Sequence, residues 1–313
     1  MVSRNVGLNA IANVKTKEEK TMMMTFDEFK KVLVNDITRV LGREIVVKEV
    51  NKINIKKTGI ILCCEPMGVS PCIYIEDLYN DYKRMPVECE YLKIMYQACF
   101  TLEGNTKDGI TDSTNLNDII DINYIMENVY MCFINTDKNR EFLKDVPHKE
   151  FFDLSIYFRV KVAKENDYIT SYVVKNQLIN KLGITEEELY KKAYNNTPKL
   201  FEPISFGINE LMFGQKTKPK YNLFYILTNK EKNNGSINIL YHENLKKVAD
   251  LYESDLYIIP SSIHEVILMP VGCNVDDIHD MCKAVNNEEV REEEVLGDTI
   301  YKYERETGYI IPA

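Results

Sequence analysis

Apolar residues recur along the chain at two spacings, one typical of helices and one typical of strands. From Thr25 to Leu41 they recur at helical spacing, and Glu28 stands three residues after Thr25, as in a capping box. This segment is therefore predicted to be the first helix. A second capping box predicts a helix after Thr185, which Pro198 is expected to end. Further helices are predicted at 87–102, 116–129, 136–147, 175–183, 242–252 and 275–287.

Strand-like segments lie between these helices. Residues 44–57 and 60–66 are predicted to be two strands joined by a turn at Thr58–Gly59. Residues 151–164 are predicted to be one long strand, with residues 167–174 as its partner. Two strongly apolar strands flank the polar residues 260–265, a length that fits a hairpin. The remaining strands are predicted at 71–79, where a helix follows, and at 130–135, 222–229, 236–241, 255–259, 266–271 and 299–304.

This order of elements predicts an α+β fold with mixed, mainly antiparallel sheets flanked by helices. The length of 313 residues suits two lobes. They are predicted to be an N-terminal α+β lobe at 22–134 and a C-terminal α+β lobe at 135–313. Residues 1–21 lack apolar periodicity and are predicted to be a loose, dispensable leader, and the polar residues 103–117 are predicted to be a loop.

Composition narrows the classes of function. The chain is 45% hydrophobic and 28% charged, as globular proteins are, and its formal net charge is -9. Acidic chains bind phosphate backbones poorly, so direct nucleic-acid binding is not expected, whereas a basic protein partner is compatible with this charge. No run is long and apolar enough to cross a membrane, and no export signal precedes the first helix. A cytoplasmic location is therefore expected.

Eight cysteines raise the question of a metal site. None of them forms a C-x-x-C pair, and most stand in apolar stretches, as Cys63 and Cys64 do. They are predicted to be buried, reduced side chains, so no metal and no cofactor is expected. The segment that runs from Asn229 to Ser236 has a single glycine, so it is interpreted as a tight turn rather than a phosphate-binding loop.

Several stretches, in a fixed order, resemble a known bacterial family. They are DKNREFLKDVPHKEFFDLSIYFRV, ITEEELYKKAYNNTPKLF, YILTNKEKNNGSINILY, SDLYIIPSSIHEVILMPV and YKYERETGYI. The family is catalogued as domain of unknown function 5688 and is known from gut-dwelling anaerobic bacteria, and the resemblance extends from Phe26 to the C-terminus. It implies the fold but no reaction. The association of this family with mobile elements implies interplay with a host.

The loop 260–265 holds the first candidate site residues, Ser261, Ser262, His264 and Glu265. A hydrolase site is disfavoured because the two serines lie between strands, and not at a strand-to-helix elbow. A zinc helix is disfavoured because the second histidine of H-E-x-x-H is missing. The favoured interpretation is a hairpin loop whose serine hydroxyls bind backbone amides.

Asp145, His148 and Glu150 form a second candidate group, whose spacing allows a carboxylate–imidazole relay. The favoured interpretation is again structural, with Asp145 capping a turn and His148 bonded to backbone. Folding could also draw His148 and His264 into one polar site between the lobes.

The sequence therefore predicts a non-catalytic intracellular binding protein that recognises another protein, in an oligomeric state left open. One alternative is an enzyme with an inter-lobe site around His148 and His264, so catalysis stays an open question. A second alternative is an inhibitor of a host defence system, carried by a mobile element.

Overall fold

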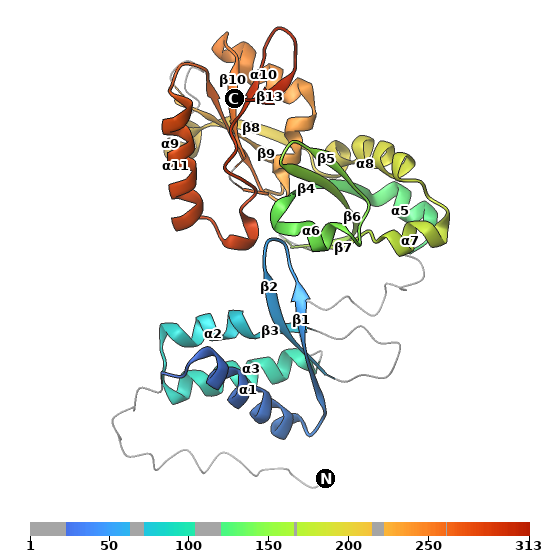
Figure 1. The fold of residues 1–313 in the computed structure, drawn as a ribbon, viewed down its shortest axis with the longest axis vertical. Coiled ribbons are helices and arrows are strands. Elements are labelled where there is room, and N and C mark those ends of the chain that lie inside the picture. The colour runs from blue at the N-terminus through green and yellow to red at the C-terminus, as the bar shows by residue number, and fades with distance from the viewer. Residues whose placement is uncertain (1–22, 63–71, 104–119, 166–167, 215–221, 261) are drawn as a thin grey trace. The chain divides into compact units, whose positions relative to one another are not determined.

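The computed structural model describes residues 23–62, 72–103, 120–165, 168–214, 222–260 and 262–313 (Figure 1). Contacts between Cα atoms separate two compact units, the first formed by Met1–Asn51 with Lys56–Thr111 and the second by Lys52–Ile55 with Asp112–Ala313. The predicted boundary near residue 135 differs from this division, because β4 (Val129–Asn135) pairs along its whole length with β6 (Leu154–Glu165). The predicted leader and most of the predicted loop 103–117 lie outside the described residues.

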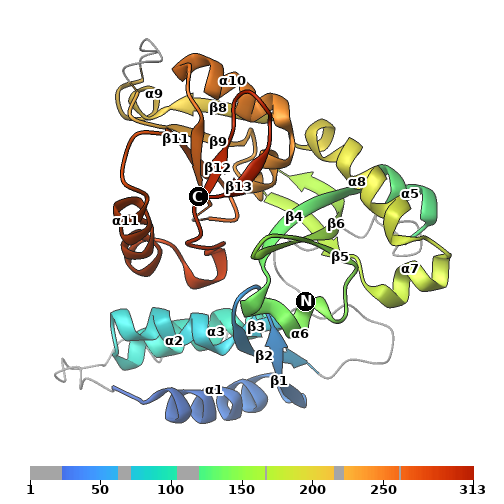
Figure 2. The same cartoon turned by 45° about the horizontal axis from the view of Figure 1, so that its top comes forward.

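In its described residues, the first unit is a three-stranded antiparallel sheet with three helices. Its elements are α1 (Phe26–Leu41), β1 (Ile45–Asn51), β2 (Lys56–Leu62), β3 (Cys72–Tyr74), α2 (Ile75–Arg84) and α3 (Glu88–Leu102), and the strand order is β1-β2-β3. The capping box is confirmed, because the Glu28 amide donates to the Thr25 hydroxyl and the Thr25 amide donates to the Glu28 carboxylate. Figure 2 shows the three helices lying alongside one another in this unit.

The helices and the sheet of the first unit share one apolar core. Helix α1 buries Phe29, Leu33 and Ile37, which recur every four residues on one face. The Phe29 ring stacks on Tyr82 of α2, with ring centroids 5.1 Å apart, and meets the edge of Tyr91 of α3 at 6.0 Å. The core of this unit therefore depends on aromatic contacts between helices.

The turn between β1 and β2 lies at residues 52–55, and the prediction of a turn at Thr58–Gly59 was wrong. Asn54 takes the left-handed conformation that a tight turn requires, with φ of 63°. Gly59 instead lies inside the β2 ladder, opposite Lys48. A Cβ atom there would lie 2.6 Å from Cys72 Sγ of β3. The glycine therefore permits close approach of a neighbouring strand and does not mark a turn.

The described part of the second unit contains two antiparallel sheets. One sheet has β4 on one side of β6, and β5 (His148–Phe151) and β7 (Tyr168–Val173) on the other. The other sheet has the order β13-β12-β10-β11-β9-β8. Its strands are β8 (Pro203–Gly207), β9 (Tyr225–Asn229), β10 (Leu256–Ile259), β11 (Val266–Pro270), β12 (Tyr301–Tyr303) and β13 (Ile310–Pro312). The predicted α+β class with mainly antiparallel sheets is confirmed.

Helices flank these sheets. They are α5 (Ile122–Asn128), α6 (Arg140–Leu143), α7 (Asn176–Leu182), α8 (Glu186–Leu200), α9 (Ile208–Phe213), α10 (His242–Tyr252) and α11 (Val275–Glu288), with short 3-10 helices at Asp137–Asn139, Gly235–Leu240 (η3) and Glu292–Glu294 (η4). Residues 236–240 thus lie in a 3-10 helix, where the sequence predicts a strand.

A chain reversal in the second unit also differs from the predictions. The long strand predicted at 151–164 is divided by a two-residue turn at Phe152–Asp153, so that Phe151 pairs with Leu154. Phe152 has φ of 56°, and the Asp153 carboxylate accepts hydrogen bonds from Thr299 at 2.9 Å and from the Tyr301 hydroxyl. Contacts with the last strands of the chain therefore hold this turn.

Helix α8 continues through Pro198 to Leu200, although the proline was expected to end it. Proline has no N–H to donate to the carbonyl four residues earlier, that of Tyr194. The hydroxyl of Tyr241 donates to this carbonyl instead, at 2.7 Å. A side chain from outside the helix thus compensates the missing backbone donor.

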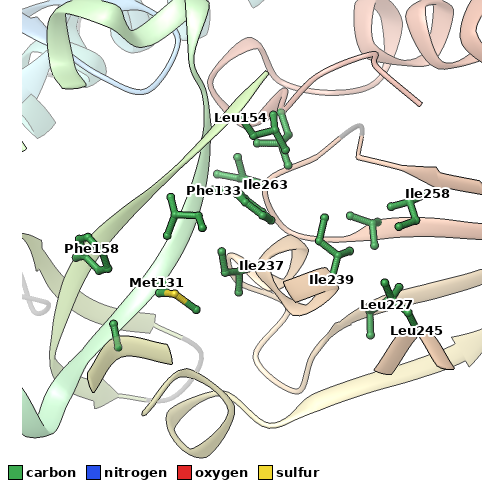
Figure 3. Close-up of a cluster of buried hydrophobic side chains, with 14 of the residues drawn as sticks. Met131, Phe133, Leu154, Phe158, Leu227, Ile237, Ile239, Leu245, Ile258 and Ile263 are labelled. Atoms are coloured by element: carbon green, nitrogen blue, oxygen red, sulfur yellow. The ribbon is translucent and has the colours of Figure 1, made fainter. Parts of the chain in front are cut away.

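The two sheets of the second unit share one apolar core (Figure 3). Met131 and Phe133 enter it from β4, while Ile258 enters from β10. Ile237 and Ile239 of η3 fill the space between them, as Figure 3 shows. This core fixes η3 and the loop after β10, where several candidate site residues lie.

Candidate functional site

The β10–β11 connection is a hairpin, as predicted, with Ile259 opposite Ile267. Ser262 is buried, and its hydroxyl accepts a hydrogen bond from the His264 amide at 3.0 Å. The Ile263 amide donates to the carbonyl of Glu294 at 2.9 Å. The loop is therefore held by hydrogen bonds within it and by a backbone bond to a distant segment. Ser261 lies outside the described residues.

His264 joins this loop to the segment around Gly235. The Asn234 amide donates to His264 Nδ1 at 3.3 Å, and His264 Nε2 lies 3.7 Å from Glu294 Oε1. Because a backbone amide can only donate, Nδ1 acts as the acceptor, and the neutral ring carries its proton on Nε2, toward the carboxylate. The His264 carbonyl accepts from the Thr228 hydroxyl at 2.7 Å and from the Gly235 amide at 3.0 Å.

Asn229 has a structural role in the same region. Its side chain accepts from the Asn233 amide at 3.1 Å and donates to the Asn233 carbonyl at 2.8 Å, which closes the turn before η3. Gly235 follows this turn, and a Cβ atom there would lie 2.4 Å from Thr228 Oγ1 and 2.5 Å from the His264 carbonyl. The glycine therefore allows η3 to meet the β10–β11 loop, a role that its turn-like sequence context did not indicate.

These contacts leave little catalytic capacity in the loop. The Ser262 oxygen is bonded to a backbone amide, and both ring nitrogens of His264 face groups of the loop's own surroundings. Glu265 is half-buried and directly precedes β11. A nucleophile needs a base within hydrogen-bond reach, and the contacts of Ser262 include no such base among the described residues. The side chains of Ser262 and His264 therefore accept hydrogen bonds from backbone amides and hold the loop in place.

The second candidate group, at residues 145–150, is not assembled into a relay. Asp145, His148 and Glu150 are all exposed, and no hydrogen bond joins any two of their side chains in the described part of the chain. The ring of His148 lies 3.0 Å from the Val146 carbonyl through Nδ1. His148 and His264 also make separate sets of contacts, so the described residues form no shared site around both histidines.

Two turns that are far apart in the sequence form a polar pocket of about 380 Å³, lined by Glu253–Asp255 and Glu304–Thr307. Two of its lining charges, those of Asp255 and Arg305, are paired with neighbouring side chains. The Lys302 ammonium, 2.9 Å away, and the Arg305 amide lower the pKa of the Asp255 carboxyl. Arg305 donates to Asp250 at 2.9 Å. In the described residues, no three His, Cys, Asp or Glu side chains lie close enough together to hold a metal ion.

Sequence reasoning missed an apolar surface on α3. One side of this helix packs into the core through six residues: Tyr91, Ile94, Met95, Ala98, Cys99 and Leu102. A second side of the helix presents Leu92, Tyr96 and Phe100, which are 39%, 59% and 55% exposed. We call these three residues the α3 apolar stripe. Their regular spacing of four residues was a signal available in the sequence.

Fold and surface together define an α+β protein of two compact units, one of which carries an exposed aromatic stripe. The chain belongs to a family of unknown function, DUF5688, whose model matches residues 26–305. Comparisons with curated proteins and with solved structures found no match. In the described part of the chain, every helix is too short or too polar to span a membrane.

Proposed function

We propose that the protein is a non-catalytic binding protein that recognises another protein through the α3 apolar stripe. The observation that carries this proposal is that a single helix has apolar residues on two sides, and only one of these sides packs into the core. Large apolar side chains exposed together on a folded protein are typical of interaction sites.

The composition of the α3 apolar stripe suits recognition. Tyrosine supplies a large contact area and loses little conformational entropy on binding, and aromatic residues dominate the energetics of most interfaces. Leu92, Tyr96 and Phe100 are spaced by one helical turn, or about 6 Å each. This spacing matches the apolar face of a second helix laid against α3.

The charges around the α3 apolar stripe define the partner further. Lys93, beside the stripe, is already bonded to Glu90 at 2.8 Å. The cation next to the stripe is thus compensated and favours no acidic ligand. The expected partner is an amphipathic helix of another protein, whose apolar side chains would pack between Leu92, Tyr96 and Phe100.

A site-directed crosslink tests this proposal. A photoreactive residue replaces the exposed Gln97, which lies next to Tyr96 in α3, and the crosslinked protein is identified after irradiation in the native host. The identified partner is then purified, and its affinity is measured for the wild type, for Tyr96→Ser/Phe100→Ser and for Tyr309→Ser. Tyr309 is 69% exposed and lies in the second unit, so its variant is the matched control.

The double variant should bind the partner about 100-fold more weakly, because two aromatic anchors are lost, while the Tyr309 variant should bind normally. Equal affinities for the wild type and the double variant would refute the proposal. A crosslink only to a second copy of the chain would also refute it, since the partner would then be the protein itself. If residue 97 forms no crosslink at all, the proposal is also refuted.

A further inference from the structure

Helix α11 of the second unit also exposes apolar side chains that the core does not use. Its buried residues Ile278 and Cys282 pack on the six-stranded sheet, in a cluster with Tyr257 of β10. Met281 and Val285 lie on another side of the helix and are 49% and 40% exposed. These two residues are one helical turn apart, so they form a short apolar strip along α11.

Acidic side chains border this strip. Successive residues of a helix are about 100° apart, so residues 277, 281, 284, 285 and 288 lie on one side of α11. Asp277 comes one turn before Met281, and Glu288 comes about one turn after Val285. All the side chains on this side are exposed. We call them the α11 face: Asp277, Met281, Ala284, Val285 and Glu288.

The carboxylates of the α11 face are not compensated by cations. Neither Asp277 nor Glu288 forms an ion pair with any residue that the structure describes. Lys283 lies on the other side of the helix, where its ammonium is 3.9 Å from the carboxylate of Asp298. Residues 275–295 contain eight acidic and two basic residues, so their formal net charge is -6, two thirds of the -9 of the whole chain. The potential at this face is therefore negative.

We propose that the α11 face binds a basic amphipathic helix of another protein. Apolar side chains of that helix, spaced by one turn, would pack on Met281 and Val285. Its lysine or arginine side chains would lie beside Asp277 and Glu288, the acids at the two ends of the strip. Burial of the apolar strip supplies affinity, and the complementary charges supply a fast association and select basic partners over others.

The same charges disfavour other occupants. A second copy of the chain bound through this face would place identical carboxylates against each other, because a two-fold contact joins the same surface of both molecules. The phosphate groups of nucleic acids and of anionic lipids would be repelled as well. This inference does not depend on the proposed function, because the α3 apolar stripe belongs to the other unit.

Fluorescence anisotropy with a labelled model peptide tests the α11 face. The peptide is an amphipathic helix of leucine and lysine, about five turns long. One comparison peptide has the same composition in an order that gives no apolar side, and another has glutamate in place of every lysine. The test variants are Met281→Ser/Val285→Ser, which removes the apolar strip, and Asp277→Asn/Glu288→Gln, which removes its flanking charges.

Each test variant has a matched control on another helix of the same unit. Leu211→Ser/Met212→Ser removes two exposed apolar side chains of α9, which are 55% and 66% exposed. Glu186→Gln/Glu187→Gln removes two exposed carboxylates of α8 that form no ion pair with a described residue. Melting temperatures are measured for all four variants, so that any loss of binding is compared between folded proteins.

We expect the wild type to bind the leucine–lysine peptide and neither comparison peptide. Met281→Ser/Val285→Ser should weaken binding about 10-fold, because two apolar side chains are no longer buried by the peptide. Asp277→Asn/Glu288→Gln should weaken binding about 5-fold, and its affinity should depend less on added sodium chloride. Both control variants should bind as tightly as the wild type.

The proposal is overturned if the wild type does not bind the leucine–lysine peptide, if it binds all three peptides equally, or if the test variants bind as tightly as their controls. Weaker binding by Tyr96→Ser/Phe100→Ser, with normal binding by Met281→Ser/Val285→Ser, would place the peptide on the α3 apolar stripe. That result would overturn this inference and leave the proposed function standing. A wild-type dimer that Met281→Ser/Val285→Ser abolishes, measured by analytical ultracentrifugation, would identify a second copy as the occupant and would also overturn it.

Discussion

The hydrogen bond from Tyr241 to α8 can be tested by removing one oxygen atom. In Tyr241→Phe the ring still packs on Tyr194, whose ring centroid lies 4.8 Å away, but the Tyr194 carbonyl loses its donor. Pro198, four residues later, has no N–H that could replace the hydroxyl. One lost hydrogen bond and a partly buried carbonyl without a partner should destabilise the second unit by about 1–2 kcal/mol, or about 2–8 °C in melting temperature.

A double-mutant cycle isolates this contact. In Pro198→Ala the new backbone N–H can donate to the Tyr194 carbonyl, so that the loss of the hydroxyl should then have a smaller effect. The expected coupling between the two substitutions is about 1 kcal/mol. The assay is urea unfolding, with hydrogen exchange of the α8 amides to report on the second unit separately. An equal effect of Tyr241→Phe in the wild type and in the Pro198→Ala variant would refute the reasoning.

Three shorter predictions follow from other contacts, each checked by the free energy of unfolding. Gly235→Ala should destabilise the protein by about 3 kcal/mol, because the new Cβ atom would lie 2.4 Å from Thr228 Oγ1. Gly297→Ala should have little effect, since the atom nearest to its added Cβ atom lies 3.5 Å away. Equal destabilisation by the two alanine variants would contradict this reasoning. Ser262→Ala should lower the free energy of unfolding by about 1–2 kcal/mol. An unchanged free energy would show that the Ser262 hydroxyl does not stabilise the loop. The folded-state pKa of Asp255 is lowered, so the Asp255 carboxylate stabilises the folded protein. This stabilisation is complete above about pH 4 and disappears as the pH falls through the folded-state pKa. Asp255→Asn should therefore be less stable than the wild type at about pH 7, and the difference should shrink as the pH falls below about 4. A difference that stays constant with pH would contradict the assignment.

Elements whose ends depend on neighbouring residues could be predicted from the sequence. The capping boxes at Thr25 and Thr185 and the left-handed Gly183 all lie at helix ends, as expected. Local hydrogen bonds decide these positions, so a short window of sequence contains the necessary information. The β10–β11 hairpin was predictable for the same reason.

Features that depend on distant residues could not be predicted. Apolar residues continue across the turn at Phe152–Asp153, and the partner that holds Asp153 is Tyr301, 148 residues later. Pro198 is a helix breaker by its own chemistry, and only Tyr241 makes it tolerable within α8. In both cases a side chain remote in sequence overrides a local preference.

The candidate site residues show the same division. The backbone role of Ser262 followed from its position between two apolar strands, and the structure shows the expected hydrogen bond. The isolation of His148 from His264 could not be foreseen, because sequence spacing does not specify which loops meet.

Sites of function are expected where a protein breaks a structural rule without compensation. The loop 260–265 attracts attention by its polar residues, but Ser262, His264 and the backbone groups around them find partners within the fold. Another place in the described residues lacks such compensation. The α3 apolar stripe exposes large apolar side chains that burial against a partner would stabilise. An amphipathic helix of another protein would supply that burial. Recognition is therefore better sought at this stripe than at the histidines.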